Sequence, residues 1–131
     1  MNIIQKVQEG SQVLFNNTLV YNADAYDVIN VTIAAHASNT EVDLVSSSAA
    51  DVGLLVIFAD AYNEGAGATL HYTHTDPLML GVPAPVVLDA PQMFVGPGMV
   101  ALFGLVDKIW VSNSGAQARI VNIIIGRKSV V

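Results

Sequence analysis

The residues best suited to bind a metal ion lie in one short segment, which contains His71, His74 and Asp76. Zinc takes about three or four protein ligands, with imidazole nitrogens and carboxylate oxygens among them. Residues three apart in a β-strand point to opposite faces of the sheet. The two histidines can therefore bind the same ion only if a β-bulge lies between them. His36 completes a ligand set only through a tertiary contact. We therefore expect no zinc site and assign these histidines to the surface or to an interface.

Acidic side chains offer a second possible metal site, which would suit calcium. Asp60, Asn63 and Glu64 lie in one expected loop, and Asp24 and Asp27 lie in another. Calcium takes about six to eight oxygen ligands, and neither loop has the Asp-x-Asp-x-Asp-Gly spacing. We expect no metal ion and no cofactor.

The sequence contains no catalytic motif. It lacks the Gly-x-Ser-x-Gly turn that presents a nucleophilic serine. Gly96-Pro97-Gly98 lacks the Lys-Ser/Thr of a phosphate-binding loop, and we do not expect it to open a helix. Most of the 11 Asp and Glu residues lie at expected turns, where carboxylates are ordinarily solvated. We predict that the protein is not an enzyme.

The composition is unusually poor in charge, because 12% of the 131 residues are charged and 53% are hydrophobic. Soluble domains contain roughly 25% charged residues. The longest apolar runs, Val52–Ala59 and Met99–Val106, are 8 residues each, whereas a membrane-spanning helix needs about 20. The hydrophobic surplus is therefore expected inside the fold and against other protein, and no membrane partner is expected.

The distribution of charge argues against nucleic-acid binding. Five Lys and Arg against 11 Asp and Glu give a net charge of −6. Four of the five cations lie at or after Lys108, and Lys6 is the other. Binding to phosphates needs a basic stripe, and anionic lipid attracts basic clusters. Neither partner is expected.

Apolar residues recur with a period of two, as in β-strands. Ile29, Val31 and Ile33 alternate with polar or small residues, which indicates a half-buried strand. Both faces of Arg119–Ile125 are largely apolar, so this strand is expected to be central or covered by a neighbouring subunit. Gly53–Ala59 is typical of a fully buried strand. Further strands are expected at Gln12–Phe15, Leu19–Asn22, Glu41–Ser46, Ala68–Thr73, Pro85–Asp89, Gln92–Val95, Met99–Phe103 and Lys108–Ser112.

Turn residues separate these segments at short intervals, among them Asn16-Asn17 and Gly96-Pro97-Gly98. The nearest candidate for a helical turn is Ser46–Val52. Many short strands with regular turns predict an all-β fold, a single antiparallel β-sandwich domain over residues 1–131 that is jelly-roll-like.

The segment from Ile109 to Gly126 consists of a strand, an Asn-Ser-Gly turn and a long last strand. With the acidic, cysteine-free composition, this ending resembles the jelly-roll decoration (cement) proteins of tailed phages, which trimerise on capsids. The resemblance implies a structural virion protein that forms a homotrimer and clamps subunits of a major capsid protein or another shell protein. It also implies synthesis in the host cytoplasm and a final location on the capsid surface.

We expect the residues that contact other subunits to lie in apolar segments outside the core of the sandwich. Prolines punctuate the apolar stretch Leu78–Leu88, which is either an arm on a neighbour or a crossover loop packed on its own sandwich. The candidate interface residues are Leu78, Met79, Leu80, Val82, Pro83, Pro85, Met93, Phe94, Trp110, Val130 and Val131.

Two alternatives stay open. One is a carbohydrate- or receptor-binding β-sandwich module, in which an outward-facing Trp110 would provide an aromatic platform. Loss of glycan binding in Trp110→Ala would favour it. The other is a small single-jelly-roll capsid subunit, which would assemble into closed particles without a partner.

Replacing Leu80 by Asp is expected to dissociate the oligomer without unfolding the monomer, because it places a charge in an apolar contact. The measurement is the mass in solution by light scattering. An unchanged mass would remove this segment from the interface.

Overall fold

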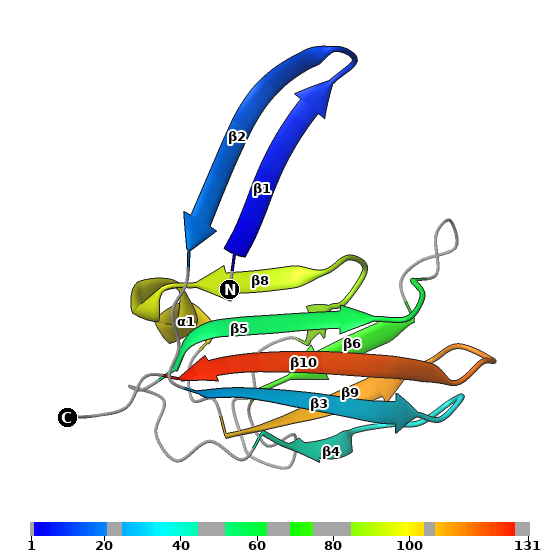
Figure 1. The fold of residues 1–131 in the computed structure, drawn as a ribbon. Helices are drawn as coiled ribbons and strands as arrows, with labels where there is room; N and C mark the ends of the chain where they lie inside the picture. Colours follow the sequence, from blue (N-terminus) through cyan, green and yellow to red (C-terminus); the bar gives the residue numbers. More distant parts are fainter. Residues whose placement is uncertain are drawn as a thin grey trace.

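The computed structural model describes residues 2–20, 25–44, 52–62, 69–74, 85–103 and 107–127. Within these ranges the chain forms two four-stranded antiparallel sheets that pack face to face, and a separate hairpin that extends away from them (Figure 1). The predicted all-β sandwich is confirmed.

The two sheets are named here after their long central strands. The β10 sheet has the order β3 (Ala25–Ile33), β10 (Arg119–Arg127), β5 (Val52–Ala59) and β8 (Gln92–Val95). The β9 sheet has the order β4 (Thr40–Asp43), β9 (Lys108–Asn113), β6 (Leu70–Thr73) and β7 (Val86–Val87). Strand β10 is central, as its two apolar faces predicted, because it pairs with both β3 and β5.

The core lies between the sheets and follows the alternation along each strand. On the β10 sheet, one face of β5 and one face of β10 are completely buried against the β9 sheet. The predicted burial of the strand around Gly53–Ala59 is confirmed. The buried side chains with no exposed surface include Ile33, Leu55, Ile57, Ile109, Val111, Val121, Ile123 and Ile125.

One end of the sandwich is closed by a short helix, α1 (Pro97–Phe103), which packs beside β5 and β8 (Figure 1). The predicted strand Met99–Phe103 is therefore wrong, as is the expectation that Gly96-Pro97-Gly98 opens no helix. Gly96 turns the chain at a φ of 90°, and its carbonyl accepts the N–H of Val100 at 3.0 Å. Val100 and Phe103 then face the core together, because residues three apart share a helix face.

The N-terminal hairpin consists of β1 (Asn2–Glu9) and β2 (Gln12–Val20). The chain reverses at Gly10-Ser11, where Gly10 has a φ of 58° and Glu9 pairs with Gln12. A glycine at the first position of a two-residue turn gives the twist that hairpins require. The predicted turn at Asn16-Asn17 is wrong, because both residues stay in the ladder opposite β1.

A chain of hydrogen bonds ties the two sheets together beside the helix. The Tyr72 hydroxyl on β6 donates to Gln92 Oε1 on β8 at 2.6 Å, and Gln92 Nε2 donates to the carbonyl of Val87 at 2.7 Å. The Tyr72 ring also stacks on Phe103, with centroids 6.1 Å apart. Burial raises the pKa of Tyr72 to about 12, so the hydroxyl stays protonated and remains a donor at neutral pH.

The turn between β9 and β10 is organised by one buried amide, Asn113. Its Nδ2 donates to the carbonyls of Gln117 at 2.8 Å and Ile33 at 3.4 Å, and its Oδ1 accepts the N–H of Gly115 at 3.0 Å. A Cβ on Gly115 would lie 3.1 Å from Asn113 Oδ1 and 3.3 Å from Thr69. Only glycine fits there without displacing a neighbour, so the Asn-Ser-Gly turn is fixed by packing as well as by hydrogen bonds.

Replacing Asn113 by Ala is expected to lower the free energy of unfolding by about 1–3 kcal/mol, because buried polar groups of the turn lose their partners. The measurement is urea-induced unfolding. Ser114→Ala is the control, since Ser114 is exposed and its hydroxyl makes one long contact of 3.4 Å to Thr69 O. Equal losses in the two variants would show that Asn113 does not organise the turn.

Candidate assembly surface

The histidines considered as metal ligands lie apart. His71 is in register with Ser112 and Val87 on the β9 sheet, whereas the His74 ring lies 5.2 Å from the Phe103 ring at the end of the sandwich. Asp76 lies outside the described residues. In the part of the chain that the structure describes, no group of three His, Cys, Asp or Glu side chains is placed to hold a metal ion.

The acidic residues considered for calcium make structural contacts where the structure describes them. Asp60 Oδ1 accepts the N–H of Ile120 at 3.0 Å, and its own N–H donates to the Ile120 carbonyl at 3.0 Å. These bonds join the end of β5 to the start of β10. Asp27 forms an ion pair with Arg127 at 2.8 Å. Asp24, Asn63 and Glu64 lie outside the described residues.

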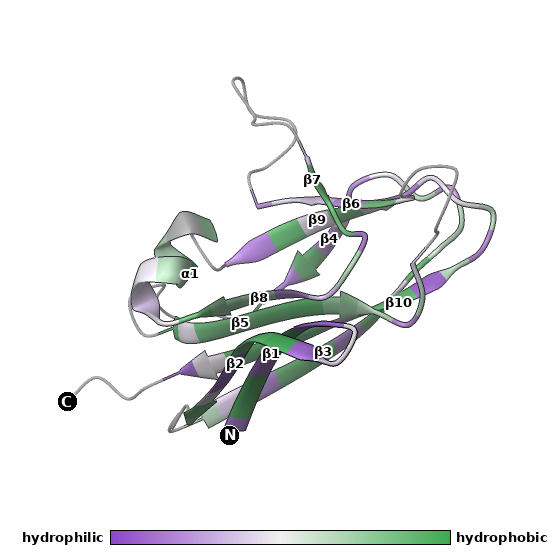
Figure 2. Cartoon of the chain, turned by 90° about the horizontal axis from the view of Figure 1, so that it is seen from above, coloured by the Kyte–Doolittle hydropathy of each residue, from purple (hydrophilic) through white to green (hydrophobic). Residues whose placement is uncertain are grey.

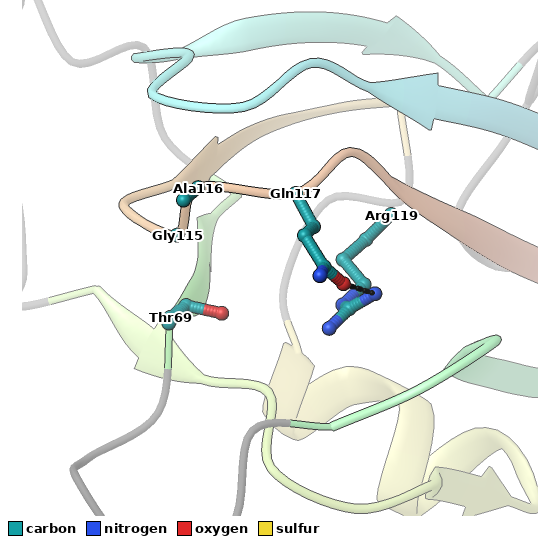
Figure 3. A pocket seen from close by; sticks show the side chains of 5 residues that line it. All are labelled: Thr69, Gly115, Ala116, Gln117 and Arg119. Carbon is teal, nitrogen blue, oxygen red and sulfur yellow. Dashed lines mark hydrogen bonds between the residues drawn. The ribbon is translucent and has the colours of Figure 1, made fainter.

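A hollow of about 320 Å³ lies beside the β9–β10 turn and is lined by Thr69, Gly115, Ala116, Gln117 and Arg119 (Figure 3). Arg119 is the one charged residue of this lining, and its Nη1 donates to Oε1 of Gln117, which also lines the hollow, at 3.3 Å. The lining contains no carboxylate or imidazole. It therefore provides no acid–base pair, and it does not suggest an active site.

The outer face of the β10 sheet is apolar, which is unusual for the exposed side of a sandwich. One row of side chains crosses all four strands in register, and it consists of Val28, Ile124, Val56 and Met93. Figure 2 shows hydrophobic colour along β5 and over much of β10. The other outward positions of the four strands are Tyr26, Asn30, Thr32, Leu54, Phe58, Val95, Ile120, Asn122 and Gly126.

None of these outward positions carries a charge, although the chain has 16 charged residues. The uncharged area is hereafter called the outer face. Its exposure is uneven: Val28 is 63% exposed, Ile120 is 42% exposed and Met93 is 41% exposed. Leu54 and Val56 in its middle are buried, because Ile3 of β1 packs on them.

The hairpin presents a second apolar surface. Ile3 pairs with Leu19 and Val7 pairs with Phe15 on one side of the ladder, and this side is hereafter called the hairpin face. Only Ile3 at its base is buried, with 5% exposure, whereas Val7 and Phe15 are 53% and 49% exposed. The hairpin face therefore begins on the outer face and continues away from it into solvent.

Four of the sequence-predicted interface residues are described, and they lie in different environments. Met93 lies on the outer face. Phe94 faces the core, with its ring edge-to-face to Phe103 at 5.7 Å. Trp110 is half-buried on the outward side of β9, in register with Glu41. Pro85 is exposed before β7. The remaining candidates, Leu78, Met79, Leu80, Val82, Pro83, Val130 and Val131, lie outside the described residues.

The end of the proline-containing stretch packs on its own sandwich. Leu88 is 2% exposed in the core, and its N–H donates to the Leu70 carbonyl at 2.9 Å. Residues 75–84 lie outside the described part of the chain, so whether that segment contacts a neighbour stays a prediction.

Sequence reasoning missed the hairpin and most of the outer face. The signal for the hairpin was Gly10-Ser11 between Glu9 and Gln12, because a Gly-Ser pair between two apolar segments is typical of a two-residue turn. The signal for the outer face was the pair Ile120 and Ile124, which make the second side of β10 apolar. They indicated that another element or subunit covers this side, but not which neighbouring strands complete the surface.

Comparison of the chain with protein-family models, with curated proteins and with solved structures gives no match. Among the described residues, no helix is long and apolar enough to cross a membrane.

Proposed function

We propose that the protein is a structural assembly protein that associates with copies of itself and with a larger protein shell. The observation that carries the proposal is the uncharged outer face, which continues into the exposed apolar side of the hairpin. Surfaces of this kind mark sites of association. Obligate interfaces are apolar and bury about 2,000 Å² or more in total.

The energy of covering these surfaces is of the size that association requires. Fully burying one exposed Val, Leu, Ile, Phe or Met side chain contributes roughly 1.5–3 kcal/mol. Association costs about 4–15 kcal/mol in lost freedom of movement. Val28, Ile120, Met93, Val7 and Phe15 are between 41% and 63% exposed, so covering each contributes roughly half of that amount and covering all five offsets roughly 4–8 kcal/mol of the cost.

The fold supports a more specific form of the proposal, in which the sandwich is a jelly roll. Strands β3 to β10 form two sheets of four, and every connection except β6–β7 passes from one sheet to the other. Eight strands in two interleaved Greek keys are characteristic of jelly rolls. With the resemblance in Ile109–Gly126, this order favours a capsid decoration protein that forms a trimer on a virion surface.

The carbohydrate-binding alternative would place its site on the other sheet. Trp110 lies on the outward side of β9, but the same side carries the ion pair between Lys108 and Glu41 at 2.8 Å. The uncharged area is larger on the β10 sheet, and it is apolar rather than rich in the hydroxyl, amide and carboxylate groups that bind sugars. Self-association therefore explains the uncharged outer face of the β10 sheet, which carbohydrate binding at Trp110 leaves unexplained.

Replacing Val28 by Asp is expected to dissociate the oligomer. Val28 is 63% exposed, so the charge is solvated in a free chain and becomes unfavourable only when another protein covers it. Light scattering should give a lower mass than for the unaltered chain, while the circular dichroism spectrum still shows a folded β-protein.

Val87→Asp is the matched control. Val87 is also an exposed valine in a strand, but it belongs to the β9 sheet, and its substitution should leave the mass unchanged. Dissociation by Val87→Asp with no effect of Val28→Asp would place the interface on the opposite sheet and contradict the assignment of the outer face.

A further inference from the structure

Resting on the proposed self-association, we infer that the hairpin face of one copy binds the outer face of a second copy. The contact pairs the side chains around Val7 and Phe15 with those around Val28, Ile124 and Met93. Each copy has both surfaces, so the same contact repeats from copy to copy and closes a ring where its rotation returns to the first subunit.

The hairpin needs a cover that the described part of its own chain does not provide. A two-stranded hairpin is marginally stable in water by itself. In the described part of the chain, β1 and β2 pack mainly on each other, and Ile3 is the hairpin residue that is buried on the sandwich. The rest of the hairpin extends away from the sheets (Figure 1). In the inferred contact, a second molecule supplies the packing that stabilises its outer part.

The side of the hairpin that binds is indicated by Ile3. Its side chain already lies on Leu54 and Val56 of the same chain, and Ile3 belongs to the hairpin face with Val7 and Phe15. Contact between the hairpin face and an outer face is thus present once within the molecule. The inferred contact brings the same two apolar surfaces, the hairpin face and the outer face, together between two molecules.

The two surfaces match in chemistry. From Ile3 to Val7 and from Phe15 to Leu19, the hairpin face carries apolar side chains and the amides of Gln5 and Asn17, and the charged residue of this side, Glu9, lies beyond that area beside the turn. The outer face carries apolar side chains, the amides of Asn30 and Asn122 and the hydroxyls of Thr32 and Tyr26, again with no charge. Lys6 lies on the opposite side of the hairpin. A charged partner would leave these uncharged surfaces without complementary groups, whereas a second copy matches both.

Cysteine pairs test this contact directly, because the chain has no cysteine. Val7→Cys and Phe15→Cys are made as single variants for the hairpin face, and Val28→Cys, Ile120→Cys and Met93→Cys for the outer face. Each hairpin variant is mixed with each sheet variant and oxidised. A disulfide forms only where Cα atoms come within about 7 Å, and between two single variants it must join two molecules.

The expected result, for at least one hairpin-face pair, is a disulfide-linked dimer at twice 13.8 kDa that forms when the two variants are mixed and not when either variant is oxidised alone. Ile4→Cys and Val13→Cys are the matched controls. They lie on the opposite side of the hairpin and are 70% and 47% exposed, and they should give no such product with the same sheet variants. All substituted positions are exposed, so the variants are expected to fold.

The outcomes separate the inference from the proposed function. If the unaltered chain is an oligomer but no hairpin-face pair links, or the control pairs link equally well, the inference is overturned and self-association stands. In that case the hairpin is free to bind another protein, such as a shell subunit. If the unaltered chain is a monomer at all concentrations and no pair links, both proposals fail.

Discussion

The apolar character of both faces of β5 is the constraint on which the rest of the structure depends. Seven of its eight residues, Val52–Ile57 and Ala59, are buried, and its position between β10 and β8 means that each face must be covered by another layer. The β9 sheet and α1 cover the inner face. On the outer side Ile3 covers only the area around Leu54 and Val56. Strand β5 is therefore covered on both faces, whereas Val28, Ile120 and Met93 on the neighbouring strands stay exposed on the outer side.

This difference connects the hydrophobic composition with assembly. An ordinary sandwich places polar or charged residues on its outer faces, and this chain does so around Lys108 and Glu41 on the β9 sheet. The outward positions of the four strands in the β10 sheet carry no charged residue, although the chain has a net charge of −6. Charge is thus absent from the outer face. Like charges repel copies of the same chain, so an uncharged side is the one on which copies approach each other at the lowest cost.

The architecture could be predicted from the sequence where side-chain alternation determines structure. The buried β5 and the central β10 could be predicted from their apolar residues, because a strand that is apolar on both faces needs a neighbour on each side. Three elements could not be predicted in this way. Pro97–Phe103 forms a helix because Gly96 and the open end of the sandwich allow Val100 and Phe103 to enter the core together. Asn16 and Asn17 stay in a strand because pairing with β1 outweighs their preference for turns. The outer face arises from register between strands that are distant in sequence, as for Val28 with Ile124 and Ile124 with Val56, which periodicity within one segment cannot provide.

The mass of the unaltered chain in solution tests the central claim most directly, because the claim is that these surfaces are covered by other protein. Light scattering across a dilution series should give a constant multiple of 13.8 kDa, with three copies as the number that the resemblance implies. A monomer at every concentration would contradict the account, since the outer face and the hairpin would then be stable in water without a second copy.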